Sequence, residues 1–165
     1  MFKTILPEEL KETSFKKIGK EWTLISTKNS EKLNTMTASW GGFGVLWNKN
    51  VCFIFIRPQR YTYDLLENTE YFTLSFLNED KKDVLNYCGK ISGKNENKLE
   101  NIDLKKVEDE NFIYFEEANM VIKCKKLYYN DIDPENFIDD KINNFYKNKD
   151  YHRMYVGEII QCQVK

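Results

Sequence analysis

The sequence predicts a mainly β protein, an antiparallel β-barrel with short helical insertions. Seven short stretches are rich in Val, Ile, Phe, Tyr and Thr, the composition that is typical of strands. Helical signals are few and short, and they do not alternate regularly with the strands as they would around a parallel sheet. The predicted strands are Trp22–Thr27, Thr35–Trp40, Val51–Ile56, Tyr71–Leu77, Asn111–Phe115, Met120–Tyr128 and Met154–Val164.

Two details support antiparallel pairing. The segment from Trp47 to Asn50 is typical of a turn, and it joins a strand at Phe43–Trp47 to the strand at Val51–Ile56. In Met120–Tyr128 apolar side chains alternate with lysines, so we expect one face of this strand to be wet.

The helical signals predict four short helices. Proline or capping residues begin them, and Gly89 ends the third. Two polar stretches, Gly93–Asp109 and Asp139–Asp150, are expected to be exposed. Each precedes a strand that the core needs, so we expect one domain over residues 1–165. The predicted helices are Pro7–Leu10, Arg60–Asn68, Asn78–Cys88 and Asp133–Ile138.

Composition narrows the class of protein. The 165 residues carry 25 basic and 26 acidic side chains, a formal net charge of −1, which argues against electrostatically driven nucleic-acid binding. Aromatic residues make up 15%, and only three of the basic residues are arginine. No stretch is apolar for the ~20 residues that span a bilayer, and the four cysteines form no CxxC pair, so we expect reduced thiols in a cytoplasmic protein. A redox role for Cys88 is an open alternative.

The first candidate site segment is Asn34–Gly42. If it is a strand, its hydroxyl-bearing side chains face one way and a row with small, soft and aromatic members faces the other. The two glycines at its end allow a flat ligand or another backbone to approach closely. The alternative is a strand with a polar outer face and a tryptophan in the core. The first row is Thr35, Thr37 and Ser39, and the second is Asn34, Met36, Ala38 and Trp40.

The second segment, Phe53–Asp64, runs from a buried strand into a turn with two of the three arginines and then into a helix. Backbone N–H groups at a helix start, the Thr62 hydroxyl and forked guanidinium groups suit an anion or a phosphate. Because the chain uses lysine for almost every other positive charge, Arg57 and Arg60 suggest bidentate recognition. The alternative is that Arg57 pairs with a structural carboxylate and Arg60 is solvated.

A third, weaker candidate is Tyr87–Lys94, where small residues, the Ser92 hydroxyl and lysines follow a helix. A solvated lysine-rich loop has the same sequence pattern. The only histidine is His152, and no P-loop, GxGxxG, GxSxG or HExxH motif is present. We therefore expect any chemistry to be carried by a bound organic cofactor, without a protein metal site.

Four segments together resemble the flavin reductase-like, flavoredoxin-type family with the FMN-binding split barrel. The resemblance runs from about Trp22 to Val164, and the segments occur in the same order. It implies a six-stranded antiparallel Greek-key split β-barrel, usually a homodimer, that binds FMN without a covalent link near the subunit interface. The four segments are Asn34–Trp40, Arg60–Thr62, Ser92–Lys94 and His152–Ile159.

The resemblance also implies roles for individual residues. Residues 36–40 would line the isoalloxazine and the ribityl chain. The phosphate would be held by Arg60, Tyr61 and Thr62, with Ser92 and Lys94 as weaker candidates. His152 would lie near the flavin or the dimer contact. The implied cofactor-binding set is Asn34, Thr35, Met36, Thr37, Ala38, Ser39, Trp40, Arg57, Arg60, Tyr61, Thr62, Ser92, Lys94 and His152.

The leading functional hypothesis is an FMN-binding oxidoreductase that transfers hydride or electrons between NADH or NADPH and flavin or a downstream acceptor. The bulky Trp40 and Trp47 depart from family members with small residues here, and they could narrow nicotinamide access. One alternative is an FMN-bound electron carrier without nicotinamide turnover. Another, from a different class, is an aromatic-rich barrel that binds single-stranded nucleic acid. Expected partners are a second copy of the chain and a small-molecule or protein electron acceptor, with no nucleic acid and no membrane.

Overall fold

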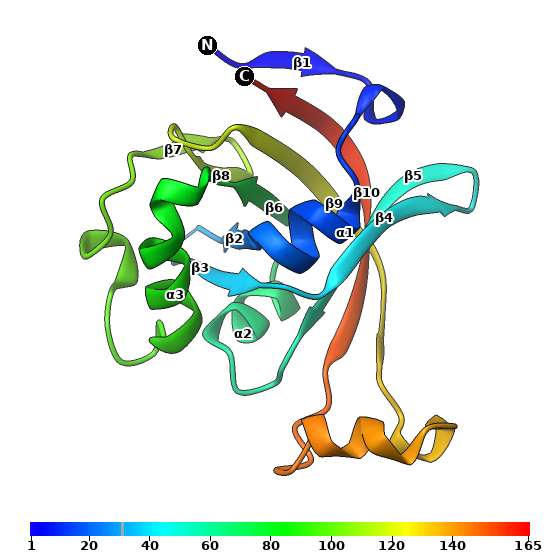
Figure 1. Ribbon diagram of the computed structural model, residues 1–165. Coiled ribbons are helices and arrows are strands. Elements are labelled where there is room, and N and C mark those ends of the chain that lie inside the picture. The colour runs from blue at the N-terminus through cyan, green and yellow to red at the C-terminus, as the bar shows by residue number, and fades with distance from the viewer. Residues whose placement is uncertain (31) are drawn as a thin grey trace.

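The computed structural model describes residues 1–30 and 32–165. Its main feature is an antiparallel sheet that curls into a barrel, with strand order β3-β2-β6-β9-β10-β5-β4 and β1 paired with the end of β10 (Figure 1). In the part of the chain described, no pairing joins β3 to β4 at the two ends of this order, so the barrel is split. The strands are β1 Lys3–Ile5, β2 Thr23–Lys28, β3 Leu33–Ala38, β4 Gly41–Leu46, β5 Lys49–Ile56, β6 Tyr71–Phe76, β9 Met120–Asp131 and β10 Arg153–Val164.

The fold class predicted from the sequence is confirmed, with a different number of strands. Six strands, β2, β3, β5, β6, β9 and β10, form the continuous wall, and β1 and β4 extend it to eight. β4 pairs with β5 across a two-residue turn in which Trp47 and Asn48 both have left-handed backbones, φ 52° and 57°. Such turns match the twist of a hairpin. A separate two-stranded ribbon consists of β7 Lys106–Asp109 and β8 Phe112–Phe115.

Two of the four predicted helices are confirmed as helices. They are α2, Tyr61–Glu67, and α3, Lys82–Lys90, whereas the other two are only single 3₁₀ turns. The sequence did not indicate α1, Ser14–Lys16, and the π-helical segment Lys17–Glu21 that continues it, because they bury only one large apolar side chain, that of Ile18. The 3₁₀ turns are Pro7–Glu9, Glu79–Lys81, Lys98–Glu100, Pro134–Asn136 and Asp140–Phe145. Among the described residues no helix has both the length and the apolar character needed to cross a membrane.

Apolar side chains gather in two clusters on opposite faces of the sheet. The larger fills the barrel and includes Ile25 and Leu74, whereas the smaller lies on the outer face and includes Leu24 and Leu85 of α3. Ile25 and Leu24 are neighbours on β2 and point to opposite faces. Both faces of β2 are covered, which explains why Thr23–Thr27 is buried throughout. α3 therefore packs against the strands that lead to the candidate site.

The prediction of a wet face on the strand around Lys123 was wrong at that residue. Lys123 is 4% exposed, forms an ion pair with Asp109 of β7 and places its ammonium 5.0 Å from the ring centre of Tyr114 on β8. The β7–β8 ribbon therefore covers this part of β9. The stretch Gly93–Asp109, expected to be exposed, supplies β7 and the fully buried Lys98. Polar strands of this kind carry no hydrophobic signal.

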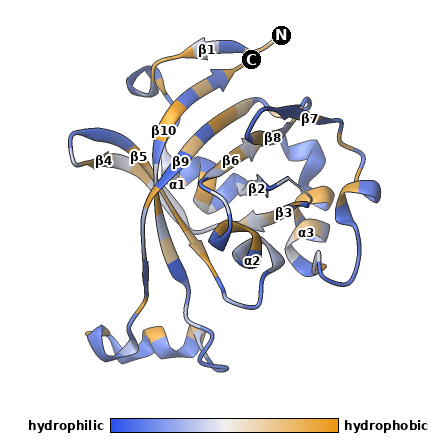
Figure 2. Cartoon of the chain, turned by 180° about the vertical axis from the view of Figure 1, so that it is seen from behind, coloured by the Kyte–Doolittle hydropathy of each residue, from blue (hydrophilic) through white to orange (hydrophobic). Residues whose placement is uncertain are grey.

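β9 and β10 are twelve residues long, and their paired ends extend beyond the barrel as an arm (Figure 1). The arm carries residues 132–152 at its tip, which is mostly hydrophilic whereas apolar residues stripe the barrel strands (Figure 2). Arg153 holds the arm to α2 through a bidentate pair with Asp131 and a 2.8 Å contact with Glu67. Arg57 and Gln59, after β5, both donate to Asp150 of the tip. The tip is thus fixed against the end of β5.

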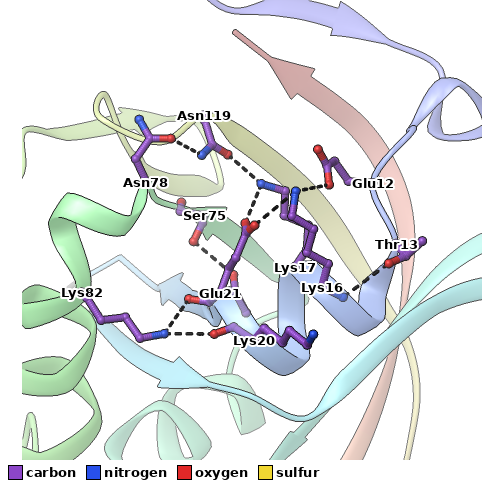
Figure 3. A network of polar contacts seen from close by, with 11 residues as sticks. Glu12, Thr13, Lys16, Lys17, Lys20, Glu21, Ser75, Asn78, Lys82 and Asn119 are labelled. Atoms are coloured by element: carbon purple, nitrogen blue, oxygen red, sulfur yellow. Dashed lines mark hydrogen bonds and ion pairs between the residues drawn. The ribbon is translucent and has the colours of Figure 1, made fainter.

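A polar network surrounds the segment α1–Glu21 (Figure 3). Lys17, 6% exposed, places Nζ 2.8 Å from Glu21 and 3.5 Å from the Asn119 side-chain oxygen. Lys82 of α3 donates to the carbonyls of Lys20 and Glu21 and lies 3.5 Å from the ring centre of Trp22. The lysine satisfies carbonyls that the end of a helix leaves free. The network fastens this segment to α3 and the barrel.

Candidate functional site

A cavity of about 170 Å³ opens to solvent where β3 ends, close to β5 and the arm tip. Five of its lining residues come from one continuous segment, and the rest come from β5, the turn after it and the start of β10. The sequence therefore brings together nine side chains that lie as far as 116 positions apart. They are Met36, Thr37, Ala38, Ser39, Trp40, Phe55, Arg57, Arg60 and His152.

The β3 wall alternates as a strand should. Met36 and Ala38 belong to the barrel core and are 5% and 8% exposed. Thr37 points the other way and donates its hydroxyl to the carbonyl of Leu85 on α3. The face that carries the threonine hydroxyls is therefore covered by a helix, and the expectation of a polar outer face was wrong.

Trp40 is not a core residue, contrary to the alternative drawn from the sequence. β3 ends at Ala38, so Trp40 lies beyond the strand and is 42% exposed. The chain then passes Gly41, whose φ is +152° and where a Cβ would come within 2.6 Å of the Phe53 carbonyl oxygen. Only glycine accommodates this close approach of two backbones. The turn at Gly41 leaves the indole at the mouth of the cavity.

Aromatic rings form the outer wall of the cavity. The Trp40 ring lies 5.5 Å from that of Phe145 in an edge-to-face arrangement and 5.0 Å from that of His152. Phe145 belongs to the arm tip and is 58% exposed. Large exposed rings beside a cavity offer a flat apolar surface to a planar ligand.

The three arginines have different surroundings. Arg57 donates to Asp150 and to the Phe145 carbonyl, which matches the structural alternative for this residue. Arg153 is held by two carboxylates on the arm and α2. Arg60 lines the cavity and is partly buried, and its guanidinium has neither an ion pair nor a hydrogen bond among the described residues. Since α2 has only seven residues, an anion at its start would depend on this guanidinium more than on the helix dipole.

The surroundings of Arg60 are positive. Burial and the nearby charge of Arg57 lower the pKa of Arg60. Lys98 is 2% exposed, and its ammonium donates to the Cys88 carbonyl at 3.2 Å. Burial lowers the pKa of Lys98 to about 8, the Cys88 thiol opposes this, and Arg60 lowers it further. The region therefore holds cations without a compensating carboxylate.

His152 begins the β10 side of the cavity and is 7% exposed. Its Nδ1 lies 2.9 Å from the Tyr146 hydroxyl. Burial lowers the pKa of His152 to about 4, the charges of Arg57 and Arg60 lower it too, and Asp150 opposes them. The imidazole is therefore neutral at pH 7.

A second group of candidate residues lies beside α2 without lining the cavity. The Asn34 amide donates to the Thr62 hydroxyl at 2.9 Å, and both side chains are buried. Gly93 packs against them, since a Cβ there would lie 2.3 Å from the Asn34 oxygen and 2.8 Å from the Tyr61 ring. Lys94, next in sequence, forms a 2.7 Å ion pair with Asp64 of α2. The segment after α3 therefore packs against the start of α2.

Two other candidates are engaged locally. The Ser92 hydroxyl accepts the backbone N–H of Lys94 at 3.3 Å. Thr35 is fully buried, accepts from the Ser26 hydroxyl at 2.9 Å and donates to the Ile25 carbonyl, so it does not reach the cavity.

Sequence reasoning missed several residues of the site. Phe55 lines the cavity, and Phe145, Tyr146 and Asp150 support its wall from the arm tip. The tip was expected to be an exposed polar excursion, yet Tyr146 is 6% exposed. The available signal was the set of large aromatic residues within an otherwise polar stretch, next to the only histidine.

The cysteines and acidic residues do not form a second reactive centre in the described chain. All four cysteines are free and buried. Burial raises the pKa of the Cys88 thiol to about 11, against a smaller opposing effect of Lys98, so the structure does not favour redox activity there. Among the residues described, no three His, Cys, Asp or Glu side chains are placed to hold a metal ion.

Comparison with known proteins identifies the family. The model of the flavin reductase like domain matches residues 15–165. Flavoredoxin of Desulfovibrio vulgaris (Miyazaki F) has 23% identity and a TM-score of 0.68, over 87% of this chain and 69% of that one. The FMN-binding protein from Thermus thermophilus with bound 1-cyclohex-2-enone has 20% identity and a TM-score of 0.66, over 86% and 68%.

A third solved structure is the NADH:FAD oxidoreductase of Streptomyces globisporus C-1027 in complex with NAD and FAD fragments. It has 14% identity and a TM-score of 0.66, over 88% of this chain and 74% of that one. These likenesses show a shared fold. Comparison with curated protein sequences gave no significant match. The family model covers nearly the whole sequence, and the chain belongs to the flavin reductase like domain family.

Proposed function

We propose that this protein binds FMN at the cavity beside Trp40 and acts as a flavin-dependent oxidoreductase. The observation that carries the proposal is the unpaired guanidinium of Arg60. The other two arginines are both neutralised by carboxylates, and a partly buried cation without one favours an anionic ligand. A flavin phosphate supplies that charge.

The shape of the cavity suits one edge of a planar ligand. Small-molecule sites usually enclose roughly 300–1,000 Å³, whereas this cavity is about 170 Å³. It can enclose part of a flavin ring, and the remainder would lie at the mouth against Trp40. Residues 37–40 line the wall, and backbone N–H and C=O groups of this segment that are free would suit the hydrogen-bonding edge of a pyrimidine.

The phosphate would lie toward Arg60. Lys98, buried close by, adds positive potential, and Lys94 lies on the adjoining segment. Thr62 and Asn34 bond each other, so their role would be to fix the start of α2 beneath the phosphate. Gly93 lets the segment after α3 approach them closely.

Bound FMN would supply the capacity to accept and release hydride or single electrons. The residues of the chain bind and orient the ring, and Trp40 and Phe145 limit water access to it. Hydride transfer to a flavin requires no protein base, so the neutral His152 is compatible with this chemistry. The neighbours include flavoredoxin and an NADH:FAD oxidoreductase, which supports the reductase hypothesis for this chain.

An FMN-bound electron carrier is the second candidate, and one observation favours it. Trp40 and Phe145 meet edge to face at the mouth and leave less room for a nicotinamide. Trp47 does not contribute, because it lies on the β4–β5 turn 6.0 Å from the Tyr128 ring. The family assignment favours either flavin hypothesis over the nucleic-acid-binding barrel.

The visible absorption spectrum of the purified protein tests FMN binding. We expect the two bands of bound flavin, or their appearance with quenched fluorescence when FMN is added to colourless protein. A protein that FMN does not affect contradicts the proposal. Anaerobic addition of NADH or NADPH then separates the two candidates, since NADH or NADPH reduces and bleaches the flavin of a reductase and leaves that of a carrier oxidised.

We also propose a homodimer. Large apolar side chains remain exposed on β4, the β4–β5 turn, β9 and β10, and they would be covered by a second copy. Size-exclusion chromatography with light scattering should give twice the chain mass of 19.7 kDa. A monomer at all concentrations would contradict this. The exposed residues are Val45, Trp47, Leu127, Tyr128, Tyr129 and Ile160.

A further inference from the structure

Among the described residues, the side chain of His152, the only histidine in the sequence, makes one hydrogen bond, and its partner is a buried tyrosine. The Tyr146 hydroxyl lies 2.9 Å from Nδ1 of His152. The two rings meet edge to face at 5.6 Å, and Tyr146 packs against Tyr151 at 4.9 Å. The tyrosine ring is therefore packed between Tyr151 of the arm tip and His152.

The surroundings of the tyrosine decide which group donates. Burial raises the pKa of Tyr146, so its hydroxyl keeps its proton at pH 7. The phenol proton then has one acceptor among the described side chains, the Nδ1 of His152. A buried hydroxyl proton left without an acceptor is costly, which favours the arrangement in which tyrosine donates.

The opposite edge of the imidazole is open. Nε2 has no hydrogen-bond partner in the described part of the chain, and it is not among the buried unpaired polar atoms there. His152 lines the cavity, whereas Tyr146 does not. The edge of the ring away from the tyrosine is therefore the edge that faces the cavity.

We propose that Tyr146 is a positioning residue that fixes the neutral tautomer of His152 with the proton on Nε2. In this tautomer the cavity wall presents a hydrogen-bond donor, suited to a carbonyl oxygen or a ring nitrogen of a planar ligand. The identification of the ligand as FMN rests on the proposed function. The assignment of the tautomer does not depend on it.

The charged groups around the ring agree with a neutral imidazole. Arg57 lies over the Tyr146 ring at 5.1 Å, and Arg60 lines the same cavity. Both arginines disfavour an imidazolium, whereas Asp150 on the arm tip favours one and is itself engaged by Arg57 and Gln59. The balance leaves the histidine to act by donating from one nitrogen and accepting at the other.

Nitrogen-15 NMR of the flavin-free protein tests the tautomer directly, because a single histidine gives unambiguous signals. At pH 7 we expect Nδ1 to have the shift of an unprotonated nitrogen and Nε2 that of a protonated one. Tyr146→Phe keeps the ring and removes the hydroxyl, so the two shifts should move toward each other as the tautomers mix. Tyr151→Phe is the matched control and should leave both shifts unchanged.

Two results would overturn the proposal. One is a protonated Nδ1 in the wild-type protein, and the other is a Tyr146→Phe variant whose nitrogen shifts are the same as those of the wild type. Amide spectra establish that both variants fold. An FMN titration of the same samples adds the second arm, in which Tyr146→Phe weakens binding about 2- to 10-fold and Tyr151→Phe does not. Absence of FMN binding in all samples would reject the proposed function and leave the tautomer result standing.

Discussion

Two of the regions in which this protein buries a cation differ in whether a carboxylate neutralises it. Around α1, the ammonium of Lys17 is matched by the carboxylate of Glu21 2.8 Å away, and Lys82 caps helix carbonyls (Figure 3). At the cavity, Arg60 and Lys98 have no carboxylate partner in the described chain. In the first network the charge of the buried lysine is neutralised within the protein. The second leaves buried positive charge unpaired, which costs stability, and this is the part of the molecule where we propose that an anionic ligand binds.

The largest expected effect breaks the self-contained network. Glu21→Gln leaves the Lys17 ammonium buried without its counter-charge and should lower the free energy of unfolding by about 3 kcal/mol. Urea denaturation measures the change. Glu79→Gln, at an exposed position in the 3₁₀ turn before α3, is the control and should change the free energy of unfolding by no more than about 0.5 kcal/mol. FMN affinity should be unaffected by either change, and a loss of affinity in Glu21→Gln would remove the contrast between the regions.

Arg60→Ala should weaken FMN binding and leave the stability of the flavin-free protein unchanged, the reverse of Glu21→Gln. Loss of the charged contact weakens FMN binding by about 1.5–3 kcal/mol, or about 10- to 150-fold. Stability of the flavin-free protein should not fall, because the guanidinium has no partner to lose. Fluorescence titration gives the affinity, with Lys90→Ala at the exposed end of α3 as the control. Unchanged affinity would exclude Arg60 from the site.

Lys98 makes stability depend on pH. Its pKa falls from 10.5 to about 8 in the fold, so the unfolded chain binds more protons between these values. Stability should therefore rise with pH, by about 1 kcal/mol between pH 7 and 9. Urea denaturation of Lys98→Met should show no such rise. If the stability of the wild-type protein and that of the variant change with pH in the same way, the pKa of Lys98 is not lowered in the fold.

The smallest effect is expected at Lys94. Its ion pair with Asp64 is exposed on both sides, and such pairs contribute little. Lys94→Ala should change stability by less than about 0.5 kcal/mol and FMN affinity by much less than Arg60→Ala does. A loss equal to that of Arg60→Ala would make Lys94 the main phosphate ligand and reverse the order of the two residues.

The barrel could be predicted from the sequence because its strands are short runs of β-branched and aromatic residues between turn signals. The covering pieces could not be predicted. β7 is polar and mostly exposed, and its contact with β9 depends on the ion pair of Asp109 with the buried Lys123, whereas α1 has almost no apolar periodicity. Local patterns carry no information on contacts that only the tertiary fold creates.

The candidate site also has a part that the sequence predicts and a part that it does not. Residues 36–40, Arg57 and Arg60 were named from local patterns, and His152 from the family resemblance. All of them line the cavity. Phe145, Tyr146 and Asp150 could not be assigned, because the arm that brings them there is set by the register of β9 on β10. The roles of the three arginines also depended on their carboxylate partners, which come from distant parts of the chain.

The anchoring of the arm tip on the end of β5 also constrains the order in which the molecule is assembled. Arg57 and Asp150 are 93 residues apart in sequence, and their pairing waits for β10 to align with β5. Closing so large a loop is slow compared with forming a hairpin. During synthesis the residues on the β3 side of the cavity are made about a hundred residues before those of its far wall, so the cavity is completed only after His152 has been made.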